Sequence, residues 1–402
     1  MKKTLGLFLM MLIACGASAA ADDSAVLQEQ DQLRQRVAVL EQKQAVADSM
    51  EAGGLGRISD AITVGGIIAG AYQYESPSGP PGVDDIDRGA VPIRVELSVK
   101  PAEADEIFFQ VGFAGGNGLN TEGHVFALTP WAAGLEDDMK NINGRDRDYL
   151  LTAWYAHTFA FGEGHSLGFT GGIIDATEYL DDNAYANCEY TQFMNEALVN
   201  GPNAFLPSYD IGGAVVWERG NLAIKGVVMG VGENDEGKAY TFYGGQMGCT
   251  LDTSLGEGTY RVVVDTTSDD FSGPGTTGKE ALKSLIFSFD QGVGEILGVW
   301  VRLGWSDDSA IIDFTDLYSG GINISGNLWG RQDDNIGLGY AHLSGGNQEI
   351  DRSQVVEGYV RFAVNDIFAV TLDAQYLDDR YKTGAGDDVD GFITGIRLTA
   401  QF

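Results

Sequence analysis

Basic residues are scarce in this 402-residue sequence, which holds 25 Lys and Arg against 58 Asp and Glu and has a formal charge of -33. Nucleic-acid binding depends on clustered Lys and Arg, so we expect no nucleic-acid partner. The four histidines lack the spacing of metal ligands: His124, His157, His165 and His342. The sequence therefore predicts no enzyme and no cofactor, with a membrane-embedded hydrolase as the alternative.

Cysteines and long hydrophobic runs are also scarce in the sequence. The cysteines, Cys15, Cys188 and Cys249, are too few for a disulfide scaffold, and whether the last two pair stays open. Past residue 20 no stretch approaches the ~20 consecutive apolar residues of a membrane helix. Glycine, with 56 copies, stands at about twice its usual share of roughly 7%. Abundant Gly, Tyr and Phe suit many short strands and turns better than helices.

Residues 1–20 have the features of an export signal. Lys2 and Lys3 precede an apolar stretch over 5–14, and small residues follow at 17–19. We expect cleavage near Ala20, which places the mature chain outside the cytoplasm. Alternatively, residues 12–15 resemble a lipoprotein cleavage box that would leave Cys15 lipidated at the new N-terminus.

Residues 21–52 contain the one clearly helical pattern. The apolar residues of about three heptads form a seam: Val26, Leu33, Val37, Leu40 and Ala47. Gln30 and Gln44 take the other core positions, where a polar residue fixes register and oligomer state. A lone amphipathic helix is the alternative, but isolated helices of this length are marginal in water. We therefore predict a periplasmic coiled coil in a homotrimer.

Residues 53–402 form the second predicted domain, in which the hydrophobic period changes from seven to two. Leu372 and Ala374, for example, alternate with Asp373 and Gln375. One apolar and one polar face are typical of strands. A soluble sandwich alternates in the same way, so the period alone does not indicate a membrane.

The number and spacing of the strands separate the two folds. Sixteen candidates lie near 61–74, 91–99, 107–114, 149–160, 166–174, 208–218, 221–230, 239–248, 258–266, 282–290, 295–305, 319–328, 334–343, 353–363, 367–377 and 390–402. Short connections follow the even-numbered candidates, whereas the others are longer, as in 75–90, 115–148, 175–207, 267–281 and 306–318. Outer-membrane barrels have short periplasmic turns and long external loops. The sequence therefore predicts an all-β fold, a 16-stranded antiparallel transmembrane β-barrel with both ends on the periplasmic side.

The last strand and the aromatic residues agree with a barrel. One face of this strand is apolar and the chain ends on an aromatic residue: Phe392, Thr394, Ile396, Leu398, Ala400 and Phe402. Four aromatic residues on the apolar parity are candidates for the girdles at the membrane surfaces: Trp217, Trp305, Tyr340 and Tyr376.

Two stretches resemble the carbohydrate-selective (OprB-like) porin family of outer-membrane β-barrels. The first is Gly171-Gly-Ile-Ile-Asp-Ala-Thr-Glu-Tyr-Leu-Asp-Asp-Asn-Ala-Tyr-Ala-Asn187, followed by residues 192–195 and 207–210. The second is Arg331-Gln-Asp-Asp-Asn-Ile-Gly-Leu-Gly-Tyr-Ala341, followed by 357–362 and 373–376. The resemblance implies a barrel in the outer membrane of a Gram-negative cell, surrounded by lipid and lipopolysaccharide. It also implies that sugars and other small polar solutes diffuse through it. Ala374 departs from the Pro that the family tends to carry there.

The residues that narrow the channel decide what passes, because sixteen strands enclose water. The connection 175–207 has no Lys or Arg and carries Asp175, Glu178, Asp181, Asp182, Asn183, Glu189 and Glu196. Basic residues fall on the polar parity of their strands: Arg94, Lys225, Arg261, Arg302, Arg361 and Arg397. If the connection folds inward, acidic loop and basic wall form a constriction that sets selectivity. Alternatively, the loop is a hydrated external surface and the arginines pair with Glu96, Glu357 or Asp373.

The sequence leaves three candidate functions and does not decide whether Ca²⁺ binds. The first function is a porin for carbohydrates, the second a general or cation-preferring porin, and the third a barrel that anchors the outer membrane through its coiled coil. Ca²⁺ is a candidate ligand of the acidic external segments, namely 84–87 and the Asp pairs at 307–308, 378–379 and 387–388. Such carboxylates can equally be hydrated.

Overall fold

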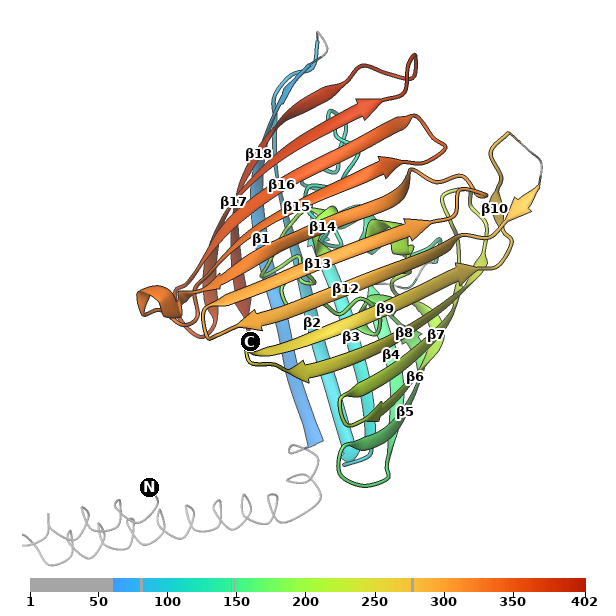
Figure 1. The fold of residues 1–402 in the computed structure, drawn as a ribbon, viewed down its shortest axis with the longest axis vertical. Coiled ribbons are helices and arrows are strands. Elements are labelled where there is room, and N and C mark those ends of the chain that lie inside the picture. Colours follow the sequence, from blue (N-terminus) through green and yellow to red (C-terminus); the bar gives the residue numbers. More distant parts are fainter. Residues whose placement is uncertain (1–60, 80–81, 146, 148, 276–277) are drawn as a thin grey trace, which may run out of the picture. The chain divides into compact units, whose positions relative to one another are not determined.

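Sixteen strands form one closed antiparallel barrel in the computed structural model, which describes residues 61–402 except 80–81, 146, 148 and 276–277 (Figure 1). They are β1 (Ile62–Ser78), β2 (Ile86–Ala102), β3 (Asp105–Gly115), β4 (Leu150–Ala160), β5 (His165–Ile174), β6 (Asp210–Arg219), β7 (Leu222–Val231), β8 (Tyr240–Asp252), β9 (Glu257–Thr267), β12 (Lys283–Val293), β13 (Leu297–Ser306), β14 (Phe314–Ser325), β15 (Asn335–Gly345), β16 (Ile350–Ala363), β17 (Phe368–Tyr381) and β18 (Val389–Gln401). The predicted barrel is confirmed. The predicted signal peptide and coiled coil lie outside the described residues.

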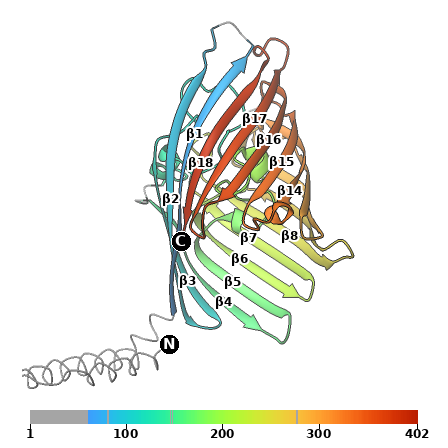
Figure 2. The same ribbon diagram turned by 90° about the vertical axis from the view of Figure 1, so that its left-hand side faces the viewer.

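The barrel closes between its first and last strands. β1 pairs with β18 from Ile67 and Gln401 to Ser78 and Asp390, and with β2 on its other edge. Figure 2 shows these three strands side by side. Closure gives every one of the sixteen strands a neighbour on both sides, so the backbone groups within the paired registers bond inside the sheet.

Short elements complete the described part of the chain. They are α4 (Glu136–Lys140), α5 (Glu196–Val199), the 3-10 turns η1 (Ala176–Glu178), η2 (Pro202–Ala204) and η3 (Gly326–Trp329), and a small hairpin of β10 (Phe271–Ser272) and β11 (Lys279–Glu280). Among the described residues, no helix has the length and apolar character needed to cross a bilayer.

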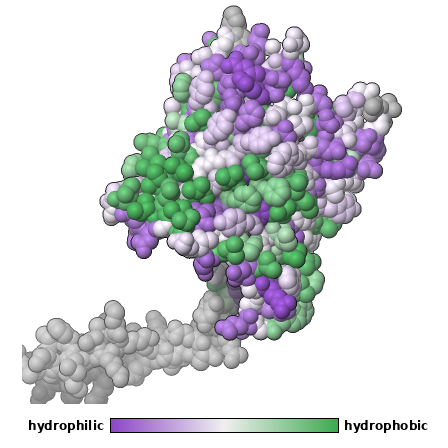
Figure 3. Space-filling model, in the orientation of Figure 1, coloured by the Kyte–Doolittle hydropathy of each residue, from purple (hydrophilic) through white to green (hydrophobic). Residues whose placement is uncertain are grey.

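The strands point apolar side chains outward and polar side chains inward. On β18, Leu398 is 55% exposed while its neighbour Arg397 is completely buried, and on β17 Leu372 is exposed while Asp373 is buried. This arrangement is the reverse of a soluble sheet protein and is typical of a wall that faces hydrocarbon. Figure 3 shows hydrophobic residues across the middle of the visible face and hydrophilic residues gathered at its upper end.

The predicted girdle aromatics lie on this outer wall, and the rings of Trp217, Trp305 and Tyr376 contact neighbouring rings. Tyr340 is exposed, and Trp217, Trp305 and Tyr376 are partly exposed. The ring of Trp305 contacts that of Tyr318 at 6.2 Å between centroids. Rings on adjacent strands therefore shield one another where a girdle is expected.

The connections differ in length between the two ends of the barrel, as predicted. Short turns link the strands at one end, at 103–104, 161–164, 220–221, 253–256, 294–296 and 364–367, with a longer one containing η3 at 326–334. The beginning of β1 and the end of β18 also lie at this end. The longest connections, 116–149 and 175–209, belong to the other end.

Two of the predicted external connections were too long. The first external connection is only 79–85 instead of 75–90, because β1 and β2 continue to pair as far as Glu75 and Ile86. Hydroxyl groups on β1 support this extension, since Tyr72 donates to Asp87 at 2.7 Å. Likewise β14 begins at Phe314 rather than near 319, which leaves a connection of 307–313.

The core lies inside the barrel, where the two long connections pack against the inner wall. We name residues 116–149 the first inner loop and residues 175–209 the second inner loop; both run within the ring of strands in Figures 1 and 2. Leu128 and Trp131 of the first and Phe193 and Leu198 of the second are buried. The sequence predicts an external loop at 115–148, and this prediction is wrong. The loop lies inside the barrel, because its apolar side chains need cover from water.

Candidate channel site

The second inner loop is attached to the wall by a buried ion pair. Arg302 on β13 donates through Nε to Asp181 Oδ1 at 2.8 Å, and neither side chain has exposed surface. The other oxygen of Asp181 accepts from the backbone N–H of Gly201 at 3.0 Å. Arg302 also donates to the carbonyl of Val199 at 3.1 Å. One guanidinium thus joins both limbs of the loop to the same strand.

Asp182 attaches the loop to three further strands. Its carboxylate accepts from Lys225 Nζ on β7 and Arg261 Nε on β9, each at 2.8 Å, and from Gln246 Nε2 on β8 at 2.9 Å. Burial opposes ionisation of Asp182, but the charges of Lys225 and Arg261 outweigh it and hold its pKa below the ordinary value. Asn183 continues this contact by donating to the carbonyl of Phe289 at 3.2 Å.

On the opposite wall, side chains bind the backbone of the second inner loop. Arg397 on β18 donates to the carbonyls of Glu189 and Gln192 at 2.7 and 2.8 Å. Glu357 on β16 accepts from the backbone N–H groups of Met194 and Asn195, the latter at 2.9 Å. The predicted alternative pairing does not occur, since among the described residues no ion pair links the arginines to Glu96, Glu357 or Asp373.

The first inner loop binds both the wall and the second loop. The carbonyl of Pro130 accepts from Gln375 at 2.9 Å and from Gln73 at 3.2 Å. Trp131 donates through its indole N–H to the carbonyl of Glu189 at 2.9 Å. The two loops therefore form one assembly within the barrel.

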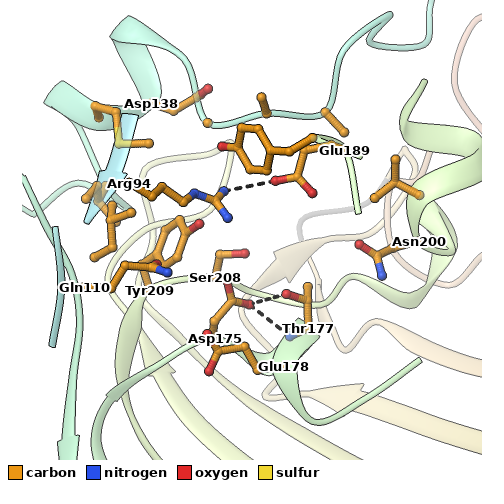
Figure 4. A pocket seen from close by; sticks show the side chains of 18 of the residues that line it. Arg94, Gln110, Asp138, Asp175, Thr177, Glu178, Glu189, Asn200, Ser208 and Tyr209 are labelled. Carbon is orange, nitrogen blue, oxygen red and sulfur yellow. Dashed lines mark hydrogen bonds and ion pairs between the residues drawn. The ribbon is translucent and has the colours of Figure 1, made fainter. Parts of the chain in front are cut away.

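A cavity of about 480 Å³ lies between the two loops and the wall at β2 and β3. Polar side chains in its lining include Arg94, Gln110, Asp138, Asp175, Glu178, Glu189, Asn200 and Ser208. In Figure 4, Arg94 reaches toward Glu189, and Asp175 and Glu178 lie on another side of the space. Arg94 is near the middle of β2, so the cavity is at mid-height in the barrel.

Arg94 is already paired within this cavity. Its Nη2 lies 3.1 Å from Glu189 Oε1, and its guanidinium carbon lies 4.7 Å from the ring centre of Tyr190 and 5.9 Å from that of Tyr209. A guanidinium stacks favourably on such rings. Arg94 is thereby fixed in position and largely neutralised.

Asp175 and Glu178 lie at the two ends of the turn η1 and differ in their partners. Asp175 is buried and accepts from Thr177 at its backbone N–H, 2.9 Å, and at its hydroxyl, 2.7 Å. Glu178 is exposed to the cavity, and no hydrogen bond or ion pair of its carboxyl is found in the described part of the chain. Desolvation by the surrounding protein, together with the charges of Asp175 and Glu96, raises the pKa of Glu178 to about 8. Burial also raises the pKa of Asp175.

The predicted site residues thus separate into three groups. Arg94, Asp175 and Glu178 line the cavity. Asp181, Asp182, Asn183, Arg302 and Arg397 hold the second inner loop against the wall, and Arg302 and Arg397 lie on the inner side as their parity predicts, but beneath the loop. Arg361 lies apart, where it donates to the carbonyl of Asp333 at 3.0 Å near the short turns.

The sequence reasoning missed the first inner loop and the two tyrosines that flank Arg94. A signal was present for the loop, because residues 119–139 contain several large apolar side chains that an exposed loop does not need. Tyr209 belongs to the segment 207–210 that carries the family resemblance, but nothing in the sequence placed its ring beside Arg94.

The acidic segments predicted as Ca²⁺ ligands do not assemble a metal site in this structure. Among the described residues, no group of three or more His, Cys, Asp or Glu side chains is arranged to hold a metal ion. Asp85 and Asp87 instead accept from the hydroxyls of Tyr74 and Tyr72. Ca²⁺ binding by these segments stays a prediction. Cys188 and Cys249 are both free.

Comparison with known proteins identifies the family. The sequence profile of the carbohydrate-selective porin, OprB family matches residues 113–402. The chain belongs to this family. An uncharacterized protein of Aquifex aeolicus (strain VF5) is 30% identical over 299 residues, which cover 74% of this chain and 84% of that protein.

Solved structures of an OprB porin share the fold. The high-pH structure of Pseudomonas putida OprB is similar with a TM-score of 0.66 at 12% identity, covering 88% of this chain and 97% of that one. Its low-pH structure has a TM-score of 0.50 at 11% identity with the same coverage. OprB-family membership and the sixteen-stranded barrel together make this protein an outer-membrane β-barrel and a channel rather than an enzyme.

Proposed function

We propose that this OprB-family barrel lets small carbohydrates and other small hydrophilic solutes diffuse passively across the outer membrane. The observation that supports this most directly is the polar cavity of about 480 Å³ at mid-height in the barrel. Cavities of a few hundred Å³ match small ligands. A hexose that enters it exchanges hydrogen bonds with water for bonds with side chains such as Arg94, Gln110 and Asn200.

Passage requires that each contact be weak enough to break. The cavity supplies separate amide, hydroxyl, carboxyl and guanidinium groups, together with the faces of Tyr190 and Tyr209. Solute binding that is favourable but spread over several weak contacts allows both entry and exit. Diffusion down a gradient then needs no energy source and no moving part.

Planar-bilayer conductance of the full-length protein tests this proposal. We expect steady single-channel currents in KCl that glucose reduces in a concentration-dependent way. Gln110→Ala should weaken the block by glucose, whereas Asp387→Asn, in the connection after β17, should leave it unchanged. Absence of conductance would contradict the channel, and conductance without any effect of sugars would favour a general porin.

A cation-preferring porin is the second candidate, and one observation favours it. Lys225, Arg261, Arg302 and Arg397 on the wall are all bound to the second inner loop, and Arg94 is paired with Glu189. Five of the six basic residues predicted to face the lumen are therefore bound to the loop, and the sixth, Arg361, lies near the short turns. The reversal potential in a KCl gradient distinguishes the two candidates, since a cation-preferring pore passes K⁺ over Cl⁻.

We also propose an orientation and an assembly. Barrels of this class have their short turns in the periplasm, and both ends of the barrel lie at the short-turn end. This supports a periplasmic position for residues 21–52, where a coiled coil joins three copies. The apolar outer wall then contacts membrane lipid and lipopolysaccharide. Anchoring of the membrane through the coiled coil is compatible with transport.

A further inference from the structure

We propose that the mid-height cavity prefers solutes that carry an ammonium group, such as amino sugars, over neutral and anionic sugars of the same size. This inference rests on the proposed channel function and adds a charge preference to it. Three observations carry it: the charge of the lining, the free carboxyl of Glu178, and the orphaned hydroxyl of Tyr190.

The titratable lining of the cavity is mainly acidic. Arg94 is its one basic side chain among the described residues, against the carboxyls of Asp138, Asp175, Glu178 and Glu189. The charge of Arg94 is offset by Glu189, which lies 3.1 Å from its Nη2, and Tyr190 covers one face, while its Nε keeps no hydrogen-bond partner among the described residues. A sugar acid would therefore meet three further carboxyls beside this one paired cation, whereas an ammonium would meet the unpaired carboxyl of Glu178.

Glu178 is the acceptor best placed to meet such a solute. It faces the cavity and has no hydrogen-bond or ion-pair partner among the described residues, whereas Oδ1 of Asp175, three residues earlier, accepts from the backbone N–H and the hydroxyl of Thr177. A nearby cation favours the charged form of a carboxyl. Binding of an ammonium would thus ionise Glu178 and gain from that charge. A neutral sugar gains no such contribution.

Tyr190 provides an independent sign that the cavity lacks a ligand group. Its side chain is 3% exposed, it lines the same cavity, and its hydroxyl has no hydrogen-bond partner in the part of the chain that the structure describes. A buried polar atom without a partner costs free energy until something binds it. The hydroxyl oxygen accepts from an ammonium donor, and the tyrosine ring face also attracts cations.

Three hexose derivatives test the charge preference in planar bilayers with the full-length protein. Glucosamine, glucose and glucuronate are compared at neutral pH by the concentration that halves the current. We expect glucosamine to act at a concentration roughly two- to five-fold lower than glucose, and glucuronate at a higher one.

Variants identify the residues behind the preference. Glu178→Gln should bring the half-blocking concentrations of glucosamine and glucose close to a ratio of one. Tyr190→Phe should shift the logarithm of that ratio by about half as much. Glu163→Gln, an identical charge change in the exposed turn 161–164, should leave the ratio unchanged. Heat-dependent gel mobility verifies that each variant has formed its barrel.

The possible outcomes separate this inference from the channel proposal. Block by glucose without preference for glucosamine, or a preference that survives Glu178→Gln, overturns the inference and leaves the porin intact. Absence of block by all three solutes contradicts the sugar channel itself. A preference that falls in Glu178→Gln and Tyr190→Phe, and persists in Glu163→Gln, supports both.

Discussion

At the scale of single residues, the charges inside this barrel mainly fix the loops. Arg302 and Asp181 have no exposed surface and no water to solvate them. Burial of such a pair gains little overall, but loss of one partner leaves an uncompensated charge. The position of the second inner loop therefore depends on keeping the two together.

We expect Asp181→Asn to destabilise the docked loop by about 3–5 kcal/mol, because the charge of Arg302 loses its partner. The measurement is the rate of proteolysis within residues 175–209 in the folded protein, which reports local opening. Replacing both residues, as in Asp181→Asn with Arg302→Met, should cost clearly less than Asp181→Asn alone. Equal rates for the single and double variants would show that the charge itself is unimportant.

Glu178 makes the selectivity of the channel depend on pH. With a pKa raised from 4.5 to about 8, its carboxyl is neutral in the folded protein under acidic conditions and ionises as the pH rises. Cation preference should therefore increase as the pH rises through about 8, the more gradually because channel water screens the charge. The raised pKa also means that the folded state holds the proton more tightly, so stability falls as the pH rises from the ordinary pKa of 4.5 to about 8.

Reversal potentials in a KCl gradient measure this titration. We expect the increase in cation preference to be largely lost in Glu178→Gln and retained in Glu163→Gln. A wild-type curve that stays flat as the pH passes through about 8 would place the carboxyl in ordinary solvent.

The sequence predicts which residues face inward but not which of them reach water. Alternation places Arg302 and Arg397 on the inner side, and both are there. Their burial depends on where a loop from another part of the chain docks, and a pattern of period two contains no information on that contact. Arg94 and Glu178 were predicted as site residues, whereas their tyrosine neighbours were not.

At the scale of elements, strands were predicted well because each has one face against hydrocarbon and one against polar groups. The errors occur where this contrast ends. The upper parts of β1 and β2 pair beyond the apolar wall through groups such as Tyr72 and Asp87, so hydrophobic periodicity underestimates their length. The first inner loop was missed because loops are normally at the surface.

A glycine on β13 determines how closely the tip of the second inner loop approaches the wall. A Cβ built on Gly298 would lie 2.3 Å from the ring of Tyr185. Gly298→Ala should therefore displace the ring, destabilise the loop by about 1–3 kcal/mol and increase current fluctuations in single-channel recordings. Gly226→Ala is the matched control, since a Cβ built on Gly226 meets no atom within 4 Å among the described residues. Quiet channels in both variants would show that the tip of the loop adapts without cost.

At the scale of the whole molecule, the even number of strands and the unequal connections were enough to predict a closed barrel. The same features cannot predict what fills it. The assembly of three copies through residues 21–52 stays a prediction, because that segment lies outside the described residues.

Deletion of residues 24–50 tests the assembly. We expect the truncated protein to keep its barrel, seen as heat-dependent gel mobility, and to lose association by at least tenfold in concentration, as about 1.4 kcal/mol of coiled-coil stabilisation requires. Sedimentation in mild detergent measures the change. A full-length protein that is monomeric at every concentration would contradict the trimer.

The two inner loops also have a consequence for how fast the protein folds. Ala127 of the first loop donates to Asp379 on β17 across 252 positions of sequence, and Asn195 of the second donates to Gln375 across 180. Contacts so distant along the chain form only after the entropy of closing long loops has been overcome, which slows folding. Both contacts connect segments early in the sequence to β17, which comes near its end. The interior therefore cannot reach its final packing until β17 is in place, and docking of the loops should be the slow, late phase of refolding.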